Sequence, residues 1–216
     1  MPDIRIADRE LRVANIFCVG RNYLEHAKEM GSSIGAEPMV FLKPSSALVQ
    51  GEAPLVLPQW SSEVHHETEL VVAIGRGGRD IPVEEALSHV AGYALGLDLT
   101  ARDVQAAAKK AGNPWTLAKG FAGAAPVSDF IAADTIRDPQ ALEFTLQRNG
   151  ELKQHAQTAD MAFGIATLIA WISARFGLQE GDLIFTGTPE GVGPIVSGDV
   201  LELSLPGLIQ KTFRVA

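Results

Sequence analysis

Short apolar runs recur along the whole chain and are the most regular feature of its pattern. They are rich in β-branched and aliphatic residues and are separated by turn-forming residues, which is typical of strands joined by tight connections. The dipeptide Asn149-Gly150 lies between two such runs and favours a two-residue hairpin turn. The pattern predicts strands at Leu11–Val19, Met39–Leu42, Pro54–Leu57, Glu69–Ile74, Tyr93–Leu97, Leu142–Gln147, Asp182–Phe185, Val200–Leu205 and Leu208–Val215.

Helical periodicity is less frequent and carries start and stop residues in three segments. The first helix is predicted to open with Asn22 as its N-cap and to end before Gly31. The second is predicted to open with Thr100 as its N-cap and to end before Gly112. The longest covers 160–176, where apolar residues recur on one helical face.

A weaker helical pattern covers Val83–Val90. Helices are thus scattered among many strands without strict β-α-β alternation, which predicts an α+β fold with a large, mostly β core. The 21 Gly and 12 Pro residues suit many short strands. Because no repeat, low-complexity tract or linker is found, residues 1–216 are expected to form one domain.

Charge narrows the classes of function. Lys plus Arg is 18 and Asp plus Glu is 26, so the formal net charge is −8. This balance argues against a nucleic-acid binder or a polybasic membrane-surface protein, which need basic patches. No apolar run is long enough for a transmembrane helix, and residues 1–12 lack the apolar core of a signal peptide. The single Cys18 lies in an apolar run, so we expect a reduced, buried thiol in a cytoplasmic protein.

Three carboxylates are the first candidates for chemistry. On a strand, Glu67 and Glu69 point to the same side because side chains alternate. The pair could simply be solvated at a strand edge. Asp98, however, ends another apolar strand just before a predicted helix, where functional side chains are often placed. Three carboxylates together would favour a hard cation such as Mg²⁺, Mn²⁺ or Ca²⁺. Zinc bound through His65 or His66 is the rival interpretation.

A histidine and a lysine are further candidates. His26 and Glu29 are three residues apart on the first predicted helix, so the carboxylate could orient the imidazole as a base. The alternative is a core histidine. Lys119 stands in an apolar, small-residue stretch and is either solvated or a partly buried charge-stabilising group. The Gly-rich loop 187–194 contains Thr188 and offers backbone N–H groups to a small anion, or is merely a tight connection.

In chain order these segments resemble the fumarylacetoacetate hydrolase family, and most closely its short members, the acylpyruvases and oxaloacetate decarboxylases. The resemblance runs from residue 16 to about residue 205 and so covers nearly the whole chain. Any one stretch is weak, but the ordered set is highly specific. The matching stretches are Val19-Gly20-Arg21-Asn22-Tyr23 with His26 and Glu29-Met30, Phe41-Leu42-Lys43-Pro44, His65-His66-Glu67 with Glu69, Asp98 through Gln105, Trp115 through Lys119, and Thr186 through Pro189 with Gly191 through Pro194.

The resemblance implies a mixed β-roll or distorted barrel with flanking helices, usually in a homodimer. It also implies a role for each matching residue. Stretch 31–37 matches the lid of the family and has no strong motif, so the lid leaves substrate choice open. The implied roles are metal binding for Glu67, Glu69 and Asp98, activation of water for His26 and Glu29, steadying of an enolate for Lys119, and binding of substrate carboxylate and keto oxygens for Arg21, Gln105 and Thr188.

The leading hypothesis is therefore a Mg²⁺-dependent acylpyruvate hydrolase that cleaves the C3–C4 bond of 2,4-dioxo acids such as acetylpyruvate or fumarylpyruvate. An oxaloacetate decarboxylase or keto–enol tautomerase would use the same metal and enolate site, and is the second hypothesis. A metal-binding or interaction protein that kept the scaffold without activity is the third. In each enzyme the partner is a small 2-oxo acid, and neither nucleic acid nor a membrane is expected.

Overall fold

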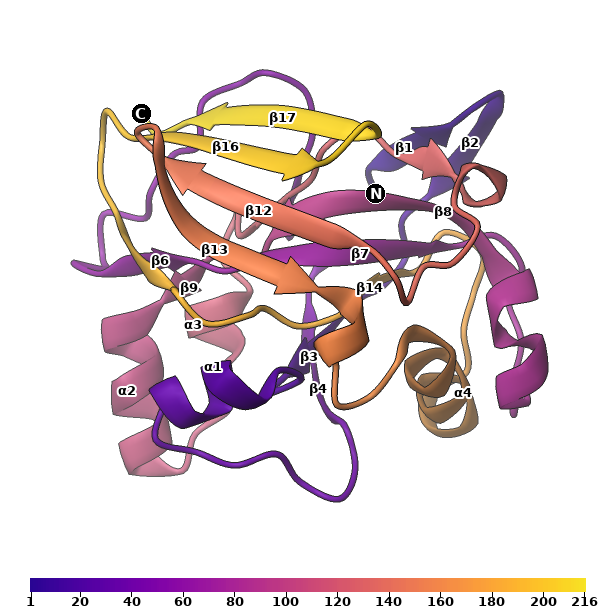
Figure 1. Cartoon of the computed structure of the whole chain (residues 1–216). Coiled ribbons are helices and arrows are strands. Elements are labelled where there is room, and N and C mark those ends of the chain that lie inside the picture. Colours follow the sequence, from indigo (N-terminus) through magenta and orange to yellow (C-terminus); the bar gives the residue numbers. More distant parts are fainter.

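The computed structural model describes residues 1–216, and strands make up most of its regular structure (Figure 1). The strands are β1 Asp3–Ile6, β2 Arg9–Arg12, β3 Ile16–Gly20, β4 Met39–Lys43, β5 Leu48–Val49, β6 Val64–His66, β7 Thr68–Ile74, β8 Val90–Leu97, β9 Thr100–Ala101, β10 Ala125–Pro126, β11 Ile131–Ala132, β12 Glu143–Arg148, β13 Glu151–Gln157, β14 Leu183–Phe185, β15 Gly193–Ile195, β16 Val200–Leu205 and β17 Ile209–Arg214. The α-helices are α1 Leu24–Glu29, α2 Arg102–Ala111, α3 Thr116–Lys119 and α4 Ile165–Phe176.

A six-stranded mixed sheet forms the centre, in the order β11-β8-β7-β14-β3-β4. Strand β7 has the sequence TELVVAI and is buried at all seven positions. Such a nearly continuous apolar run is expected of a strand covered on both faces. Only β14 and β3 pair in parallel, while the other neighbours are antiparallel.

A four-stranded antiparallel sheet, β13-β12-β16-β17, packs over β7 and β8 (Figure 1). Burial alternates along β16, with Leu201, Leu203 and Leu205 facing inward. The hairpin predicted from Asn149-Gly150 is confirmed: it joins β12 to β13 with Arg148 opposite Glu151. Both turn residues have positive φ angles, 55° and 77°, as a type I′ turn requires.

A three-stranded sheet, β15-β6-β9, lies at the end of the molecule where α1, α2 and α3 gather (Figure 1). Helix α4 packs its apolar side, with Ile165, Leu168 and Ile169, into the core. That core is one cluster of 50 buried residues. The predicted α+β class is confirmed, and the strand order leaves the sheets open rather than closed into a barrel. None of the helices is both long and apolar enough to cross a bilayer.

Several predicted strand and helix bounds were wrong. The run Leu11–Val19 is broken at residues 13–15, so that β2 and β3 belong to different sheets. Segment Pro54–Leu57 makes only an isolated bridge, between Leu55 and Val215. The pattern at Val83–Val90 forms a 3₁₀-helix over Val83–His89 instead of an α-helix. Helix α4 starts at Ile165 rather than at residue 160, after a separate turn at Thr158–Asp160.

Both predicted N-caps were also wrong, because tertiary contacts use their side chains. Asn22 accepts a hydrogen bond from Phe163 N–H and donates to the carbonyls of Phe163 and Thr186, while α1 starts two residues later. Thr100 belongs to β9 and donates its hydroxyl to Glu67. Helix α2 starts at Arg102 without a side-chain cap.

Candidate active site

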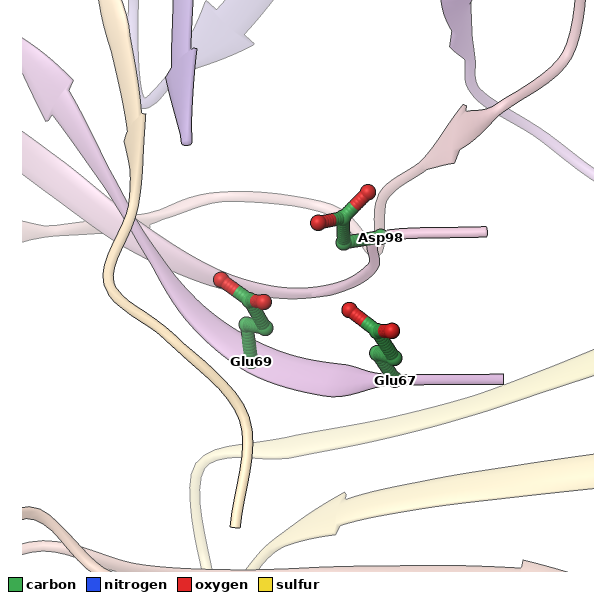
Figure 2. A group of neighbouring side chains, drawn as sticks. All are labelled: Glu67, Glu69 and Asp98. Carbon is green, nitrogen blue, oxygen red and sulfur yellow. The ribbon is translucent and has the colours of Figure 1, made fainter. Parts of the chain in front are cut away.

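The side chains of Glu67, Glu69 and Asp98 converge on one point inside the molecule (Figure 2). One oxygen from each lies within 4.8 Å of the other two. Their exposed fractions are 5%, 1% and 2%, so the solvated-edge interpretation of the glutamates is wrong. Three carboxylates this close together and this deeply buried repel one another strongly unless cations lie between them.

Two neighbouring strands position this carboxylate trio. Glu67 stands in the break between β6 and β7, and Glu69 is the second residue of β7. Although Glu67 lies just outside the strand, its side chain and that of Glu69 point to the same side, as predicted (Figure 2). Asp98 directly follows β8, which is the antiparallel neighbour of β7. The last residue of β8, Leu97, lies opposite the first residue of β7, Thr68. The register thus brings the end of β8 beside the start of β7.

Three buried or half-buried cations surround the trio. Lys119 Nζ lies 2.7 Å from both Glu67 Oε2 and Asp98 Oδ2, and is itself buried. Arg102 Nη2 lies 2.5 Å from Glu67 Oε1. Lys43 Nζ lies 2.6 Å from Asp98 Oδ1 and donates to the carbonyls of Leu99 and Lys119 in the loop and helix behind it. Glu67 and Asp98 are thus each held by two cations, whereas Glu69 has none.

This difference separates the pKa values of the two glutamates. Burial alone would raise the pKa of Glu67, but the charges of Lys119 and Arg102 hold it well below its usual value. Burial raises the pKa of Glu69, and the negative charges of Asp98 and Glu67 raise it further. The Gly187 N–H, 2.7 Å from Glu69 Oε2, offsets only part of this effect. Glu69 is therefore the trio member in greatest need of a further cation.

The trio fits a divalent metal ion. Its donors are all carboxylate oxygens, which hard cations such as Mg²⁺, Mn²⁺ and Ca²⁺ prefer. The rival zinc site is not found. His66 Nδ1 pairs with Gln154 and His65 Nε2 with Glu63, and neither histidine belongs to the group of converging ligands.

Helix α1 places a histidine and a carboxylate beside the trio. His26 is mostly buried, and its Nδ1 lies 3.1 Å from Glu29 Oε2. The other oxygen of Glu29 accepts a hydrogen bond from the Gly191 N–H. Glu29 is thus fixed between the helix and the Gly-rich loop, and it orients the imidazole with Nε2 free of any protein partner.

One cleft brings the predicted residues together. Its lining includes eight of the nine predicted site residues, and Glu29 stands behind it in contact with His26. The eight are Arg21, His26, Glu67, Glu69, Asp98, Gln105, Lys119 and Thr188. Part of the lid stretch also lines it, since Ser32 faces the same cleft.

The polar groups predicted to hold the substrate differ in whether their hydrogen-bond donors are free. Gln105 accepts a hydrogen bond from Arg102 through Oε1, and its amide N–H groups have no protein acceptor. The Thr188 hydroxyl donates to the Thr68 carbonyl and accepts from Gln154, so its hydrogen is already committed. Within the Gly-rich loop, the N–H groups of Gly187 and Gly191 are used by Glu69 and Glu29. The loop therefore binds the protein's own carboxylates rather than presenting these two donors to a free anion.

Sequence reasoning missed three residues that organise this site. Lys43 and Arg102 lie inside the matching stretches but received no role, and Gln154 was not singled out at all. Lys43 ends a strand and Arg102 begins a helix, so both resemble ordinary solvated charges in the sequence. Lys43 ends an apolar run and has no acidic residue close to it in the sequence. This is the one pattern that indicates a buried lysine.

Known proteins share both the sequence and the fold. The chain is 49% identical to the oxaloacetate tautomerase FAHD1 of Mus musculus, a mitochondrial protein, over 93% of this chain and 91% of that one. It is 46% identical to the mitochondrial oxaloacetate decarboxylase of Dictyostelium discoideum over 89% of each. The crystal structure of fumarylpyruvate hydrolase from Pseudomonas aeruginosa, in complex with Mn²⁺ and pyruvate, superposes with a TM-score of 0.95 at 38% identity, covering 100% of this chain and 95% of that one.

A family model settles which group these similarities define. The model for the C-terminal region of fumarylacetoacetate (FAA) hydrolase matches residues 15–216, which is nearly the full length. The matched region contains the carboxylate trio, the His26–Glu29 pair and Lys119. The chain therefore belongs to the fumarylacetoacetate hydrolase family.

Proposed function

We propose that this chain is a divalent-metal-dependent hydrolase that cleaves the C3–C4 bond of 3-acylpyruvates. Water adds to the C4 carbonyl, and the C3–C4 bond then breaks with its electron pair moving to C3. The products are the enolate of pyruvate and a carboxylic acid, and protonation at C3 completes pyruvate. The main obstacle is the negative charge that develops on the enolate oxygen.

The His26–Glu29 pair beside the trio is the observation that carries this proposal. Hydrolysis needs a base that takes a proton from water close to C4. His26 lines the cleft, with Nδ1 held by Glu29 and Nε2 free. A general base of this kind accelerates a reaction by about 10²–10⁴-fold. Glu29 acts through the imidazole by holding its orientation, since it does not itself line the cleft.

The remaining polar residues bind the substrate and its developing charge. Lys119 Nζ, already within 2.7 Å of two trio carboxylates, is placed to donate to an enolate oxygen beside them. The free amide N–H groups of Gln105 can hold a substrate carboxylate or keto oxygen, and Arg21 supplies a cation in the same cleft. We propose Mg²⁺ as the metal held by Glu67, Glu69 and Asp98, with Mn²⁺ or Ca²⁺ as alternatives. When bound, the metal ion would serve as a Lewis acid that lowers the energy of the enolate.

A panel of substrates tests this function. Purified protein is treated with chelator, reloaded with Mg²⁺, Mn²⁺ or Ca²⁺, and supplied with acetylpyruvate, a longer 2,4-dioxo acid or oxaloacetate. We expect metal-dependent release of pyruvate from the dioxo acids, and loss of that release in Glu67→Ala. Glu63→Ala is the matched control, because the exposed carboxylate of Glu63, close to Glu67 in sequence, pairs with His65 and with no cation of the site. Pyruvate release that survives chelator or Glu67→Ala contradicts the proposal.

Turnover of oxaloacetate is the second candidate function. It is favoured by the names of the relatives at 46–49% identity, which are oxaloacetate tautomerases and a decarboxylase. Loss of CO₂ from oxaloacetate produces the same pyruvate enolate without attack by water. Tautomerisation needs a base that takes a proton from C3 and a donor that returns one to the C2 oxygen. Measuring CO₂ release, loss of the enol and acyl cleavage in one preparation separates the three reactions. A purely metal-binding protein, by contrast, would bind Mg²⁺ and turn over none of these 2-oxo acids.

The homodimer and the cytoplasmic location expected from the sequence stay predictions. Strand β4 supports the dimer, because it is an edge strand of the central sheet and exposes 47% of Leu42. Light scattering coupled to gel filtration should give twice the 23.0 kDa mass of the chain. A mass equal to that of a single chain, measured at micromolar protein concentration, would contradict the dimer.

A further inference from the structure

Two cations of the cleft have no acidic partner in the protein. The cleft is lined by Arg21, Arg102, Lys109 and Lys119, and two of these are engaged by the trio. Lys119 pairs with Glu67 and Asp98, and Arg102 pairs with Glu67. Arg21 and Lys109 form neither an ion pair nor a side-chain hydrogen bond with any residue of the chain. Their charges are available to a ligand.

The first of these cations is held on a strained backbone. Arg21 directly follows β3 and has a φ angle of 59°, in the left-handed region that costs a non-glycine residue about 1 kcal/mol or more. Strain of this kind persists where the surrounding structure fixes it, and it gathers at ligand sites. Arg21 is therefore suited to the carboxylate that every 2-oxo acid carries beside its keto group.

The second cation stands at the outer end of an aromatic wall. Lys119 Nζ, at the trio, lies 5.1 Å from the centre of the Phe41 ring. The Phe41 and Trp115 ring centres are 5.9 Å apart, and Lys109 Nζ lies 5.2 Å from the Trp115 ring centre. All four residues line the same cleft, and Lys109 is exposed on α2. Two rings thus separate the cation at the reacting end from the cation near solvent.

The electrostatic surroundings of Lys109 favour an anion. Partial desolvation on the cleft side lowers the pKa of Lys109, and the positive charges of Arg102, Arg21 and Lys119 lower it further. Each of these three cations acts on the pKa of Lys109 more strongly than the carboxylate of Glu67, which raises it. An anionic group bound beside Lys109 would relieve this repulsion and restore the pKa of the ammonium group.

We propose that Lys109 is a specificity-determining residue that binds a second carboxylate, at the far end of the substrate. The preferred substrates are then 2,4-dioxo acids with a terminal carboxylate on the acyl chain. The aromatic wall packs against the carbon chain between the two ends. This inference rests on the proposed function, because it places the 2-oxo acid end against Lys119 and the trio.

The length of the wall distinguishes this substrate class from oxaloacetate. In oxaloacetate, the second carboxylate is C4 and is attached directly to C3, the carbon at which the reaction takes place. It would stay near Lys119 and could not extend past two rings to Lys109. Lys109 is thus expected to matter for long diacids and to leave the turnover of oxaloacetate unchanged.

A matched pair of substrates tests the role of Lys109. The Mg²⁺-loaded protein is assayed with 2,4-dioxoheptanedioate and with 2,4-dioxoheptanoate, which carries a methyl group in place of the terminal carboxylate. We expect Lys109→Gln to lower kcat/KM for the diacid about tenfold, at the lower end for hydrogen bonds to a charged group, because Lys109 is exposed. The value for the monoacid should stay within about twofold.

The neighbouring lysine provides the control. Lys110 has the same charge on the same helix but does not line the cleft. Lys110→Gln should therefore leave both kcat/KM values within about twofold of the unmodified protein, which excludes a general loss of positive potential. An equal fall for both substrates in Lys109→Gln, or no fall for either, overturns the proposal.

Ligand binding separates this inference from the proposed function. If the unmodified protein cleaves neither dioxo acid, the proposed function fails, and calorimetry in Mg²⁺ then decides the role of Lys109. The probes are 2-oxoadipate and 2-oxohexanoate, which differ only in the terminal carboxylate and need no turnover. We expect the diacid to bind about tenfold more tightly to the unmodified protein, and Lys109→Gln to abolish the difference. Equal affinity for both probes in the unmodified protein overturns the proposal.

Discussion

At the scale of single residues, Glu69 carries a conflict between stability and function. It is buried beside two other carboxylates, and its only hydrogen-bond donor is the Gly187 N–H. The raised pKa of Glu69 shows that its negative charge is costly in this position without a metal ion. The same charge is what a divalent cation would bind.

Glu69→Gln is therefore predicted to stabilise the metal-free protein while weakening metal binding. The amide keeps an oxygen for Gly187 and removes the repulsion by Glu67 and Asp98. We expect a gain of about 1 kcal/mol, which is about 2–4 °C in Tm for a chain of this size. Thermal melting in chelator, and Mg²⁺ titration by calorimetry, measure the two effects. A lower Tm together with unchanged Mg²⁺ affinity would contradict this interpretation of the trio.

Lys43 is predicted to be a structural requirement of the site. Its buried ammonium group lies 2.6 Å from Asp98 and donates to two backbone carbonyls. Lys43→Met leaves these acceptors without that partner, so we expect a loss of about 3 kcal/mol in the free energy of unfolding. Lys28→Met is the control, because Lys28 forms an exposed ion pair with Glu25 and should cost under about 1 kcal/mol. Urea denaturation compares them, and equal losses would count against a buried role for Lys43.

At the scale of elements, the loop after β14 connects the trio to the base. Gly187 donates to Glu69, and Gly191 donates to Glu29. Gly191 has a φ angle of 88°, and a Cβ atom there would lie 2.0 Å from the Lys153 carbonyl oxygen. The backbone conformation and the close approach therefore both require glycine.

Gly191→Ala is predicted to move this loop and release Glu29. We expect a stability loss of about 2–4 kcal/mol and at least a tenfold fall in hydrolysis. Gly193→Ala is the matched control, since its φ angle is not in the left-handed region and its nearest contact would be His66 Nε2 at 3.6 Å. Denaturation and steady-state kinetics on both variants test the contrast. Similar behaviour of the two variants would show that the loop does not hold the base.

Asp103, in the first turn of α2, is predicted to make the free energy of unfolding depend on pH in the acid range. Burial would raise the pKa of Asp103, but hydrogen bonds from Ser61, Ser62 and Val104 lower it to about 2, from 3.8. A lowered folded-state pKa contributes stability above pH 3.8, and that contribution is lost as the pH falls towards 2. Asp103→Asn should therefore be less stable than the unmodified protein at pH 6, with the gap narrowing below pH 4. Urea midpoints at several pH values measure the gap, and a constant gap contradicts the assignment.

At the scale of the whole molecule, local patterns predicted strands better than they predicted contacts. The hairpin at Asn149-Gly150 and the buried run of β7 follow from turn chemistry and hydrophobicity alone, and both were confirmed. The N-caps at Asn22 and Thr100 were wrong because each side chain serves a partner more than 30 residues away. No local rule contains such a partner.

The same distinction applies to the site. Alternation along one strand placed Glu67 and Glu69 on a common side, and the strand-end position brought Asp98 to them. Lys43 reaches Asp98 across 55 residues of sequence, and three strands separate β4 from β8 in the central sheet, so no local pattern contains this contact. The family resemblance supplied the joint arrangement of His26, Lys119 and the trio that spacing alone left open.

The most direct test of the central claim compares two forms of the protein on one substrate. Pyruvate release from acetylpyruvate is measured for the Mg²⁺-loaded unmodified protein and for His26→Gln, with circular dichroism to verify folding. We predict rapid release by the first, and a rate about 10²–10⁴-fold lower for the second, because no other cleft residue is held as a base by a carboxylate in this way. Equal rates in the two forms would contradict hydrolysis through His26.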